Sequence, residues 1–501
     1  MPSLPSSLPR VCVALGFASA DELMAAAEYE FKDGNKFLEF RLDYLGRPAT
    51  GIEAIRRLVK KYSDLQILAT CRARSNGGHF KGSLDAQIAV LTDAAGAGAF
   101  LIDLEIESAG RAKDKVAMLR SKRPLIVSYH NFTNTPALEP ILRRLQRVPA
   151  DAYKIVTTAR KPNDQLRLSR FLSEHSGKTP LVAFCMSEAG LASRILSPSL
   201  GCIYTYASPA ANEGTAPGQI SARQMRSLYR CDKLTRHSRL YGIIADPVSH
   251  TKSPVIHNRA FQARRLDAVY LPFLVPSNYL GEWMKVASGM GMCGFSVTIP
   301  HKQRILRYLD VVEPLAKRIG AVNTVWRRGG KWRGTNTDAE GVMEPLSRHL
   351  RLPHASVLVA GYGGGARAAA IALSDAGARI TVTGRDLRSA AALARAAKGE
   401  SVSLAEAERQ HFDALIHATP VGMFPHADRT LFSNRIPARV VLDMVYNPRE
   451  TVLLAHARQQ GCTPIYGSEM LLAQAARQFE IWTGESAPRS VMQTALETLA
   501  D

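Results

Sequence analysis

The sequence predicts an α/β protein with two halves: an amino-terminal (β/α)8 barrel, then an α/β substrate domain followed by a Rossmann domain. Three observations predict this architecture. Eight short apolar runs alternate with helix-like segments between Val11 and Ala207. A polar, basic stretch at 230–238 then precedes a new strand. Farther on, a glycine-rich loop joins an apolar strand to an alanine-rich helix, the pattern of a dinucleotide-binding turn.

The eight apolar runs are the predicted strands of the barrel. Their alternation with segments of helical spacing indicates right-handed βαβ crossovers and a parallel sheet, and eight such units favour a closed barrel. An open doubly wound sheet is the alternative, but no glycine-rich turn follows the first run. The runs are Val11–Gly16, Phe37–Tyr44, Gln66–Arg72, Phe100–Ile106, Leu125–His130, Tyr153–Ala159, Leu181–Ser187 and Ile203–Ala207.

Polar residues gather near the carboxyl ends of these runs, where (β/α)8 barrels carry their active sites. Lys154 lies in an apolar, β-branched run, and an inward-facing ammonium there is costly unless it is used. Desolvation and neighbouring cations would favour the neutral amine, which attacks ketones to form an imine. His130, an imidazole with an ordinary pKa near neutrality, is suited to move the proton. The alternative for Lys154 is a lysine that extends to solvent at a sheet edge.

Three arginines are predicted to reach the same mouth of the barrel. Glu39 and Arg41 share a face of one strand, Arg72 ends the next run, and Arg194 follows the seventh. A guanidinium binds a carboxylate through two parallel hydrogen bonds. We therefore expect Arg194, with the loop at Gln219, to hold an anionic ketone.

Four runs of this half resemble type I 3-dehydroquinate dehydratase: Glu39–Asp43, Ser128–Phe132, Lys154–Val156 and Thr215–Gln219. We place this barrel domain at 11–229. The resemblance implies a Schiff base between Lys154 and 3-dehydroquinate, with His130 as general acid and base in a loss of water that gives 3-dehydroshikimate. It also implies a substrate site lined by Glu39, Arg41, Arg72, Met186, Arg194, Thr215 and Gln219.

The chain departs from that family at two positions. Asn76 stands where a glutamate usually precedes the Gly-Gly pair, which we expect to lower the basicity of His130 or to change its orientation. Thr215 stands where serine is usual, and it keeps the hydroxyl. A barrel of the class I aldolase type is the alternative enzyme with an imine-forming lysine.

A glycine loop is the main signal of the second half. It follows the apolar run Ser356–Ala360 and opens the helix-like run Arg367–Ala376, with a second strand at Ala378–Thr383. This pattern predicts a Rossmann site, in which the glycines allow a tight turn and let the backbone approach a pyrophosphate. The predicted cofactor contacts are Gly361, Gly363, Gly364, Gly365 and Ala366.

Residues at the end of that second strand select the cofactor. An acidic residue there would bind the ribose hydroxyls of NAD, whereas Arg385 and Arg388 offer cations to the 2′-phosphate of NADP. The sequence therefore predicts NADP, and Asp386 is the group that opposes this choice.

The second half as a whole resembles shikimate dehydrogenase. The resemblance implies that Lys302, supported by Asp338, moves a proton while NADPH reduces the ketone of 3-dehydroshikimate. It implies a substrate domain at about 238–340 with a C-terminal helix at about 468–501, and a Rossmann domain at about 341–467. The matching runs are Ser249–Pro254, Val297–Lys302, Ala321–Thr324, Asn336–Asp338, the glycine loop, Asp443–Pro448, and Gly467–Leu471 with Gln474; the implied substrate contacts are Thr251, Ser253, Thr298, Asn323, Asp338, Tyr446 and Gln474.

The two halves together predict a bifunctional enzyme of the shikimate pathway, because the product of the first reaction is the substrate of the second. Thr251 replaces a usual serine and Ser296 a usual asparagine, and Gly384 and Asp386 replace residues that commonly flank Arg385. Two alternatives stay open. One is a dehydratase fused to a dehydrogenase that acts on quinate, and the other is a metabolite-sensing regulatory protein with degenerate enzyme domains that binds DNA.

Composition limits the partners. The formal charge of +20 is spread along the chain without a basic tail, which predicts a basic surface that attracts anionic substrates rather than nucleic acid.

No apolar run approaches the ~20 residues of a membrane helix, and the start lacks the regions of a signal peptide. Seven cysteines without a CxxC pair favour free thiols and no metal site. We expect a cytoplasmic enzyme with small-molecule substrates, no nucleic-acid or membrane partner, and an oligomeric state left open.

Overall fold

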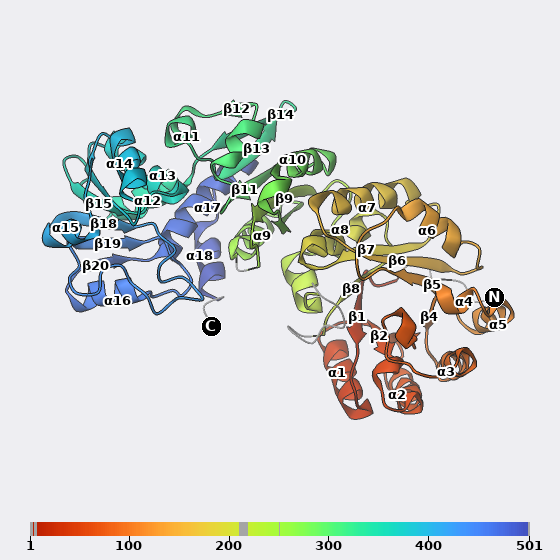
Figure 1. The fold of residues 1–501 in the computed structure, drawn as a ribbon. Helices are drawn as coiled ribbons and strands as arrows, with labels where there is room; N and C mark the ends of the chain where they lie inside the picture. Colours follow the sequence, from red (N-terminus) through yellow and green to blue (C-terminus); the bar gives the residue numbers. More distant parts are fainter. Residues whose placement is uncertain (1–3, 5–7, 210–218, 250, 499–501) are drawn as a thin grey trace. The chain divides into compact units, whose positions relative to one another are not determined.

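The computed structural model describes residue 4 and residues 8–209, 219–249 and 251–498. The chain divides into two compact units, one made mainly of residues up to Arg239 and the other mainly of residues from Leu240 onward. None of the helices in the described part of the chain is long and apolar enough to cross a membrane. Figure 1 shows the fold, with the barrel in red to yellow and the rest in green to blue.

The first unit contains eight parallel strands in the hydrogen-bonded order β7-β6-β5-β4-β3-β2-β1-β8. Directly before β8, the Ile203 amide donates to the Leu181 carbonyl of β7 at 2.8 Å, which brings the two ends of the sheet together. This near-closed sheet confirms the predicted (β/α)8 barrel. Its strands are β1 (Val11–Leu15), β2 (Phe37–Arg41), β3 (Gln66–Thr70), β4 (Leu101–Glu105), β5 (Leu125–His130), β6 (Ala152–Thr158), β7 (Leu181–Met186) and β8 (Thr205–Ala207).

Helices follow most of these strands and begin where the sequence supplies start signals. Ser19 and Ser83 cap two of them by accepting backbone amides, and Pro48 and Pro162 each occupy the first turn of another. The helices are α1 (Ala20–Lys32), α2 (Pro48–Lys61), α3 (Leu84–Gly96), α4 (Ile106–Ala109), α5 (Lys113–Lys122), α6 (Leu138–Leu145), α7 (Pro162–His175) and α8 (Leu191–Leu196).

One predicted strand ends early. The run Phe37–Tyr44 was expected to be extended throughout, but Leu42–Tyr44 form a short 3-10 turn. In this turn the Asp43 carboxylate folds back onto the guanidinium of Arg41 and accepts two hydrogen bonds, at 2.9 and 2.8 Å. The local ion pair therefore ends the strand.

The next sheet along the chain is mixed, in the order β10-β9-β11-β13-β14-β12. Helix α17 returns to this sheet from the end of the sequence: its Trp482 indole donates to the Val325 carbonyl of β13 at 3.1 Å. The elements are β9 (Arg239–Ala245), β10 (Ala268–Leu274), β11 (Gly294–Val297), β12 (Val311–Val312), β13 (Thr324–Arg328), β14 (Lys331–Thr335), α9 (Ser253–Ala263), α10 (Leu280–Gly289), α11 (Pro314–Ile319), α12 (Asp338–Ser347), α17 (Gly467–Thr483) and α18 (Arg489–Glu497).

A fully parallel sheet in the order β17-β16-β15-β18-β19-β20 completes the unit. The strand order reverses between β15 and β18, which is where doubly wound folds bind dinucleotides, so the Rossmann prediction is confirmed. The elements are β15 (Ser356–Ala360), β16 (Arg379–Thr383), β17 (Glu400–Ser401), β18 (Phe412–His417), β19 (Ala438–Asp443), β20 (Thr463–Ile465), α13 (Gly364–Asp375), α14 (Leu387–Ala396), α15 (Leu404–Arg409) and α16 (Val452–Gln459).

Candidate active sites

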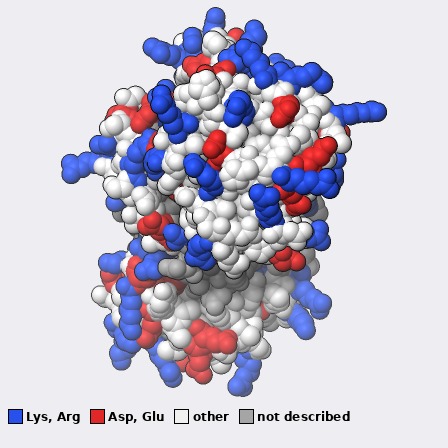
Figure 2. Space-filling model, turned by 90° about the vertical axis from the view of Figure 1, so that its left-hand side faces the viewer, with Lys and Arg blue, Asp and Glu red and all other residues white. Residues whose placement is uncertain are grey.

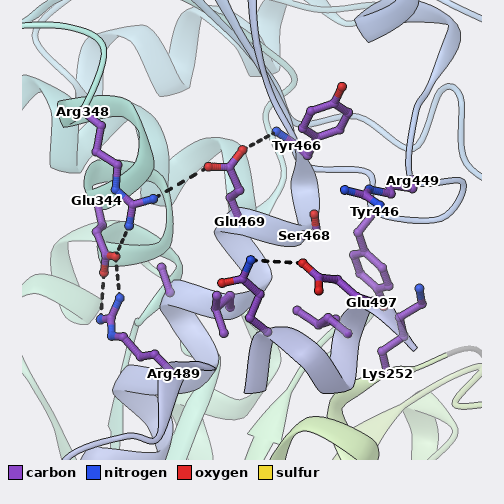
Figure 3. Close-up of a pocket in the computed structure, with 14 residues that line it drawn as sticks. Lys252, Glu344, Arg348, Tyr446, Arg449, Tyr466, Ser468, Glu469, Arg489 and Glu497 are labelled. Atoms are coloured by element: carbon purple, nitrogen blue, oxygen red, sulfur yellow. Dashed lines mark hydrogen bonds and ion pairs between the residues drawn. The ribbon is translucent and has the colours of Figure 1, made fainter. Parts of the chain in front are cut away.

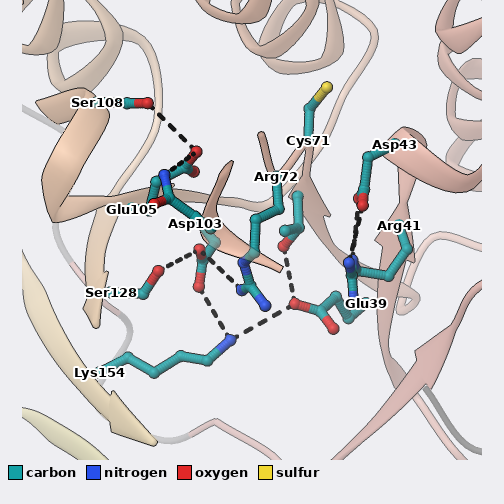
Figure 4. Close-up of polar contacts among 12 residues, drawn as sticks. Glu39, Arg41, Asp43, Cys71, Arg72, Asp103, Glu105, Ser108, Ser128 and Lys154 are labelled. Carbon is teal, nitrogen blue, oxygen red and sulfur yellow. Dashed lines mark hydrogen bonds and ion pairs between the residues drawn. The ribbon is translucent and has the colours of Figure 1, made fainter. Parts of the chain in front are cut away.

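Lys154 of β6 points into the barrel and is only 2% exposed (Figure 4). Its Nζ donates to Asp103 Oδ2 at 3.0 Å and to the Tyr206 hydroxyl at 2.8 Å, and it lies 3.6 Å from Glu39 Oε1. The nearest charges are therefore carboxylates, and the expectation that cations would flank this amine is wrong. The alternative of a solvent-directed lysine is excluded.

Tyr206 links the amine to Glu39. The phenol accepts from Lys154 and donates to Glu39 Oε1 at 3.1 Å, and Thr70 donates to the same carboxylate oxygen at 2.8 Å. Burial, followed by the charge of Glu39, raises the pKa of Tyr206, so the phenol stays protonated and remains a donor. The result is a continuous hydrogen-bonded path from Lys154 to a second carboxylate.

Asp103 of β4 holds the other side of the amine. Burial alone would raise the pKa of this carboxyl, but the charges of Lys154 and Arg72 and a hydrogen bond from Ser128 (2.7 Å) outweigh burial. The net pKa lies below the usual range, so Asp103 is ionised. Arg72 approaches Asp103 Oδ1 at 3.6 Å, and its Nε and Nη2 have no hydrogen-bond partner within the described residues.

Arg194 is a buried cation with no anion beside it in the described part of the barrel. The residue is 1% exposed, it lies over the ring of Phe184 at 4.4 Å, and none of its three guanidinium nitrogens has a hydrogen-bond partner among the residues that the structure describes. Burial lowers the pKa of Arg194 to about 10. An unpaired buried guanidinium is costly, and a carboxylate on a bound ligand would offset that cost.

His130 ends β5 half-buried, next to the Phe132 ring at 6.1 Å. Burial, followed by the charges of Arg72, Lys154 and Arg41, lowers the pKa of His130 well below its ordinary value. The structure thus corrects the expectation of a pKa near neutrality: the imidazole is neutral at pH 7 and can accept a proton. At the Asn76 departure, the side-chain amide donates to the buried Glu105 at 3.2 Å; its effect on His130 stays a prediction.

The second site brings four predicted residues together from distant parts of the chain. Lys302 Nζ lies 2.6 Å from Asp338 Oδ2 at the start of α12. The Asn323 amide donates to Asp338 Oδ1 at 2.8 Å and reaches Gln474 Oε1 of α17 at 3.4 Å. Ser296 is linked to this group through Gln478: its hydroxyl donates to Gln478, which in turn donates to the Asn323 carbonyl. The lysine, the aspartate and two amides therefore form one polar cluster.

The glycine loop lies against this cluster. Gly361 has a φ of 120°, and a Cβ there would lie 3.0 Å from the Ala418 carbonyl oxygen, so only glycine fits without strain. A Cβ on Gly364, the first residue of α13, would lie 3.3 Å from Lys302 Cδ. Because the lysine stem packs on the first turn of α13, a pyrophosphate at the helix start would place its nicotinamide end near Lys302.

Asp386 does not compete for the cofactor. Its carboxylate accepts the Arg388 amide at 3.0 Å and the Ser389 hydroxyl at 2.6 Å, so it caps the start of α14. These hydrogen bonds lower the pKa of Asp386. Arg385 and Arg388 are exposed beside it, with no ion-pair partner within the described residues, and they are available to a 2′-phosphate.

A buried histidine stabilises the segment that packs against the glycine turn at Gly361. His417 ends β18, where its Nδ1 lies 2.8 Å from Asp443 Oδ1 and its Nε2 lies 2.6 Å from the Thr419 hydroxyl. Asp443 also accepts the Thr451 hydroxyl at 2.6 Å. Since Thr419 and Ala418 border Gly361, this network holds the glycine turn in place.

Comparison with known proteins identifies both halves. Residues 11–236 match the model of type I 3-dehydroquinase, 243–325 match the shikimate dehydrogenase substrate binding domain, and 467–497 match the shikimate 5′-dehydrogenase C-terminal domain. The chloroplastic bifunctional 3-dehydroquinate dehydratase/shikimate dehydrogenase of Arabidopsis thaliana is 34% identical, over 96% of this chain and 83% of that protein. The chain belongs to this bifunctional family.

Relatives that match only the second half are shikimate dehydrogenases. The NADP(+) shikimate dehydrogenase of Thermosynechococcus vestitus is 40% identical over 53% of this chain and 97% of its own length. A crystal structure of a shikimate dehydrogenase in complex with NADP+ is 35% identical, covers 54% of this chain and 98% of that one, and superposes with a TM-score of 0.51.

The remaining predicted substrate residues of this chain lie on other strands and loops, and one lies outside the described residues. Thr251 accepts the Ser253 amide at 3.3 Å before α9, and Tyr446 lines a cleft beside α17 and α18 (Figure 3). Met186 is buried at the end of β7, Thr298 directly follows β11, and Gln219 is half-buried. Thr215 lies outside the described residues.

Sequence reasoning missed Asp103, Tyr206 and Glu105. The signal for the two acids was present, because Leu101-Ile102-Asp103-Leu104-Glu105 places carboxyls in an apolar run, as Glu39 does in its strand. Parallel pairing in register brings Asp103 of β4 to Ile126 of β5 and leaves its side chain inside the barrel. Nothing in the eighth run distinguished Tyr206 from a core tyrosine.

Proposed function

We propose that the barrel dehydrates 3-dehydroquinate to 3-dehydroshikimate and that the second half reduces 3-dehydroshikimate to shikimate with NADPH. The named activities of the relatives support both reactions. The observation that carries the proposal is the pair of costly groups in one barrel: Lys154, buried and held by carboxylates, and Arg194, buried with no counter-ion among the described residues. A substrate with a ketone and a carboxylate would satisfy both.

In the barrel, Arg194 would hold the substrate carboxylate, and Lys154 would attack the ketone. Before the attack the ammonium must lose a proton, and Asp103 and Tyr206 are the groups in hydrogen-bond contact that can accept or relay it. Loss of the carbonyl oxygen as water then leaves an iminium on Lys154, which acidifies the neighbouring carbon.

His130 would complete the elimination. As a neutral imidazole it takes the proton from the acidified carbon, and the resulting enamine expels the hydroxyl one carbon farther on. The protonated His130 gives its proton to that hydroxyl, which leaves as water, and hydrolysis of the iminium releases the product. The lowered pKa of His130 favours the first of these transfers, because it keeps the base free of a proton.

In the second half, Lys302 would give a proton to the ketone oxygen, and Asp338 would hold and recharge the lysine. The side-chain amides of Asn323 and Gln474 would form hydrogen bonds with the ring hydroxyls of the substrate. The first amides of α13 would hold the pyrophosphate, and Arg385 with Arg388 the 2′-phosphate of NADPH, which supplies the hydride when bound.

A coupled assay tests the proposal. The full chain with 3-dehydroquinate and NADPH should consume NADPH, with accumulation of shikimate. If 3-dehydroshikimate supports oxidation of NADPH but 3-dehydroquinate does not, the assignment of the barrel is wrong. If neither substrate does, the assignment of the whole chain is wrong.

A cytoplasmic location and the absence of nucleic-acid or membrane partners belong to the same proposal. All seven cysteines lie in the described residues and are free thiols, which supports a reducing compartment. The relative from Arabidopsis is named as chloroplastic, so fractionation of the source cells is the direct check.

A further inference from the structure

We propose that Tyr206 is a further catalytic residue of the barrel, and that it carries the proton of Lys154 to Glu39 and back during imine formation. This role rests on the imine chemistry proposed above. It also changes the role of Glu39, which the resemblance to the dehydratase family places only among the substrate contacts. Glu39 becomes the group that holds the proton, and Tyr206 connects it to the reacting amine.

Burial makes such a route necessary for Lys154. Figure 2 shows lysine and arginine side chains spread over one face of the molecule, where water can take their protons directly. The Lys154 side chain, in contrast, is 3% exposed, and its amine lies between the buried carboxylates of Glu39 and Asp103 (Figure 4). An ammonium inside the barrel must therefore pass its proton to a neighbouring side chain before it can attack a ketone.

Tyr206 is the link between the amine and Glu39. Lys154 Nζ lies 3.6 Å from Glu39 Oε1, which is too far for a hydrogen bond. The Tyr206 hydroxyl bridges this distance, because it accepts from Nζ at 2.8 Å and donates to Oε1 at 3.1 Å. A shift of two protons along this path neutralises Lys154, protonates Glu39 and leaves the phenol unchanged.

The closed barrel assembles this path from three strands. Tyr206 comes from β8 and Glu39 from β2, which lie on either side of β1, and Lys154 comes from β6. The Tyr206 ring packs beside the Phe184 ring at 5.8 Å, and the Lys154 amine lies over it at 4.4 Å. These contacts hold the hydroxyl between Nζ and Oε1.

Glu39 is better suited than Asp103 to hold the proton. Asp103 faces both the ammonium and the guanidinium of Arg72, and its pKa lies below the usual range. The hydrogen bonds to Glu39 come from two neutral hydroxyls, those of Tyr206 and Thr70. A carboxylate between two cations holds a proton less firmly than one with neutral donors. We therefore expect Glu39 to hold the proton during imine formation, while the charge of Asp103 stabilises the iminium.

Protons and bonds balance along this route. With one proton on Glu39, the neutral amine attacks: the bond from Nζ to the carbonyl carbon forms, the carbonyl double bond opens, and the oxygen takes a second proton from the nitrogen. Glu39 then returns its proton through Tyr206 to the new hydroxyl, the carbon–oxygen bond breaks, and water leaves. The iminium stays beside two carboxylates, so the step needs no outside acid or base.

Rapid-quench trapping of the imine with borohydride tests this role in the full chain with 3-dehydroquinate. Tyr206→Phe keeps the ring contacts and removes only the hydroxyl, so we expect adduct formation on Lys154 to slow roughly 10²-fold. Tyr204→Phe is the matched control. The Tyr204 hydroxyl lies 3.4 Å from that of Tyr206 and forms no hydrogen bond with Lys154 in the described part of the barrel, so this variant should trap at the wild-type rate.

The outcomes of this experiment separate the relay from the imine chemistry. If the wild type forms the adduct and Tyr206→Phe forms it equally fast, the relay is overturned and the imine chemistry stands. Equal slowing in both tyrosine variants would assign the loss to packing and would also overturn the relay. A wild-type chain that forms no adduct would overturn the imine chemistry itself.

Glu39→Gln distinguishes a relay from a substrate contact. In a relay the two groups act as a unit, so Glu39→Gln, Tyr206→Phe and the double variant should all trap at similar rates. If the two losses multiply in the double variant, the groups act separately and the relay is wrong. A higher KM for 3-dehydroquinate in Glu39→Gln, with an unchanged trapping rate, would make Glu39 a substrate contact alone.

A measurement on the wild type decides the question if a variant fails to fold. The trapping rate is followed in mixtures of H₂O and D₂O of increasing deuterium content. We expect the rate to fall along a curve, because two protons move in the same step. A linear fall would mean that a single proton moves, and it would overturn the relay.

Discussion

Two lysines carry the two proposed reactions, and their surroundings differ. The Lys154 side chain is 3% exposed and contacts a phenol and two carboxylates, whereas the Lys302 side chain is 20% exposed and pairs with Asp338. An imine must be formed away from bulk water and then reopened by a single water molecule, so burial suits Lys154. A proton relay must exchange its proton with solvent at each turnover, so partial exposure suits Lys302.

The largest expected effect tests the role of Lys154 in this comparison. Lys154→Ala should lower the dehydratase rate on the order of 10⁴-fold or more, because it removes the amine that forms the imine. Reduction of added 3-dehydroshikimate should stay unchanged. Separate steady-state assays of the two reactions measure this, and a parallel loss of both would mean that the two halves do not work independently.

Lys302→Ala tests the role of the other lysine, and we expect a smaller loss of turnover. Removal of a proton donor typically costs about 10²–10⁴ in turnover, while the hydride donor stays in place. We therefore expect a lower kcat for the reductase, little change in the Kd of NADPH by fluorescence titration, and full dehydratase activity. NADPH binding weakened by as much as turnover would make Lys302 a cofactor contact.

Asp103→Asn sharpens the comparison, because it keeps the shape of the barrel site and removes one of its two carboxylates. Lys154 then has only Glu39 and the Tyr206 path to take its proton, so we expect roughly a 10²-fold fall in dehydratase kcat. Gln87→Leu, which changes a buried polar neighbour of Glu105 without touching Lys154, is the matched control. A fall of the same size in the control would assign the loss to packing.

The smallest expected effect is a displacement along the pH axis. Because burial and nearby cations lower the pKa of His130 below the ordinary 6.5, the neutral base persists as the pH falls. The acid limb of kcat/KM for dehydration should therefore lie below pH 6.5. A limb at or above that pH would show that the cations around His130 do not act on it as described.

Much of both sites could be predicted from the sequence, because each lysine lies in a recognisable run. The strand around Lys154, the glycine loop and the Lys302–Asp338 pair follow from local patterns and their spacing. The partners of Lys154 could not be predicted in the same way. They come from β4 and β8, and only the closed sheet brings Asp103 and Tyr206 to the amine.

The role of Asp386 shows the same limit at shorter range. In the sequence this acid opposes a preference for NADP, because it follows Arg385 directly. In the structure its carboxylate is used to cap α14, so its charge is directed into the helix start. Sequence spacing places a side chain on an element, but the hydrogen bonds that occupy it depend on the exact backbone turn around it.

Reductive trapping tests the central claim most directly. The full chain is incubated with 3-dehydroquinate and borohydride, digested, and analysed by mass spectrometry. We predict an irreversible mass increase on the peptide that contains Lys154 and none on the peptide that contains Lys302. An unmodified Lys154, or equal labelling of both lysines, would contradict the division between an imine-forming amine and a proton relay.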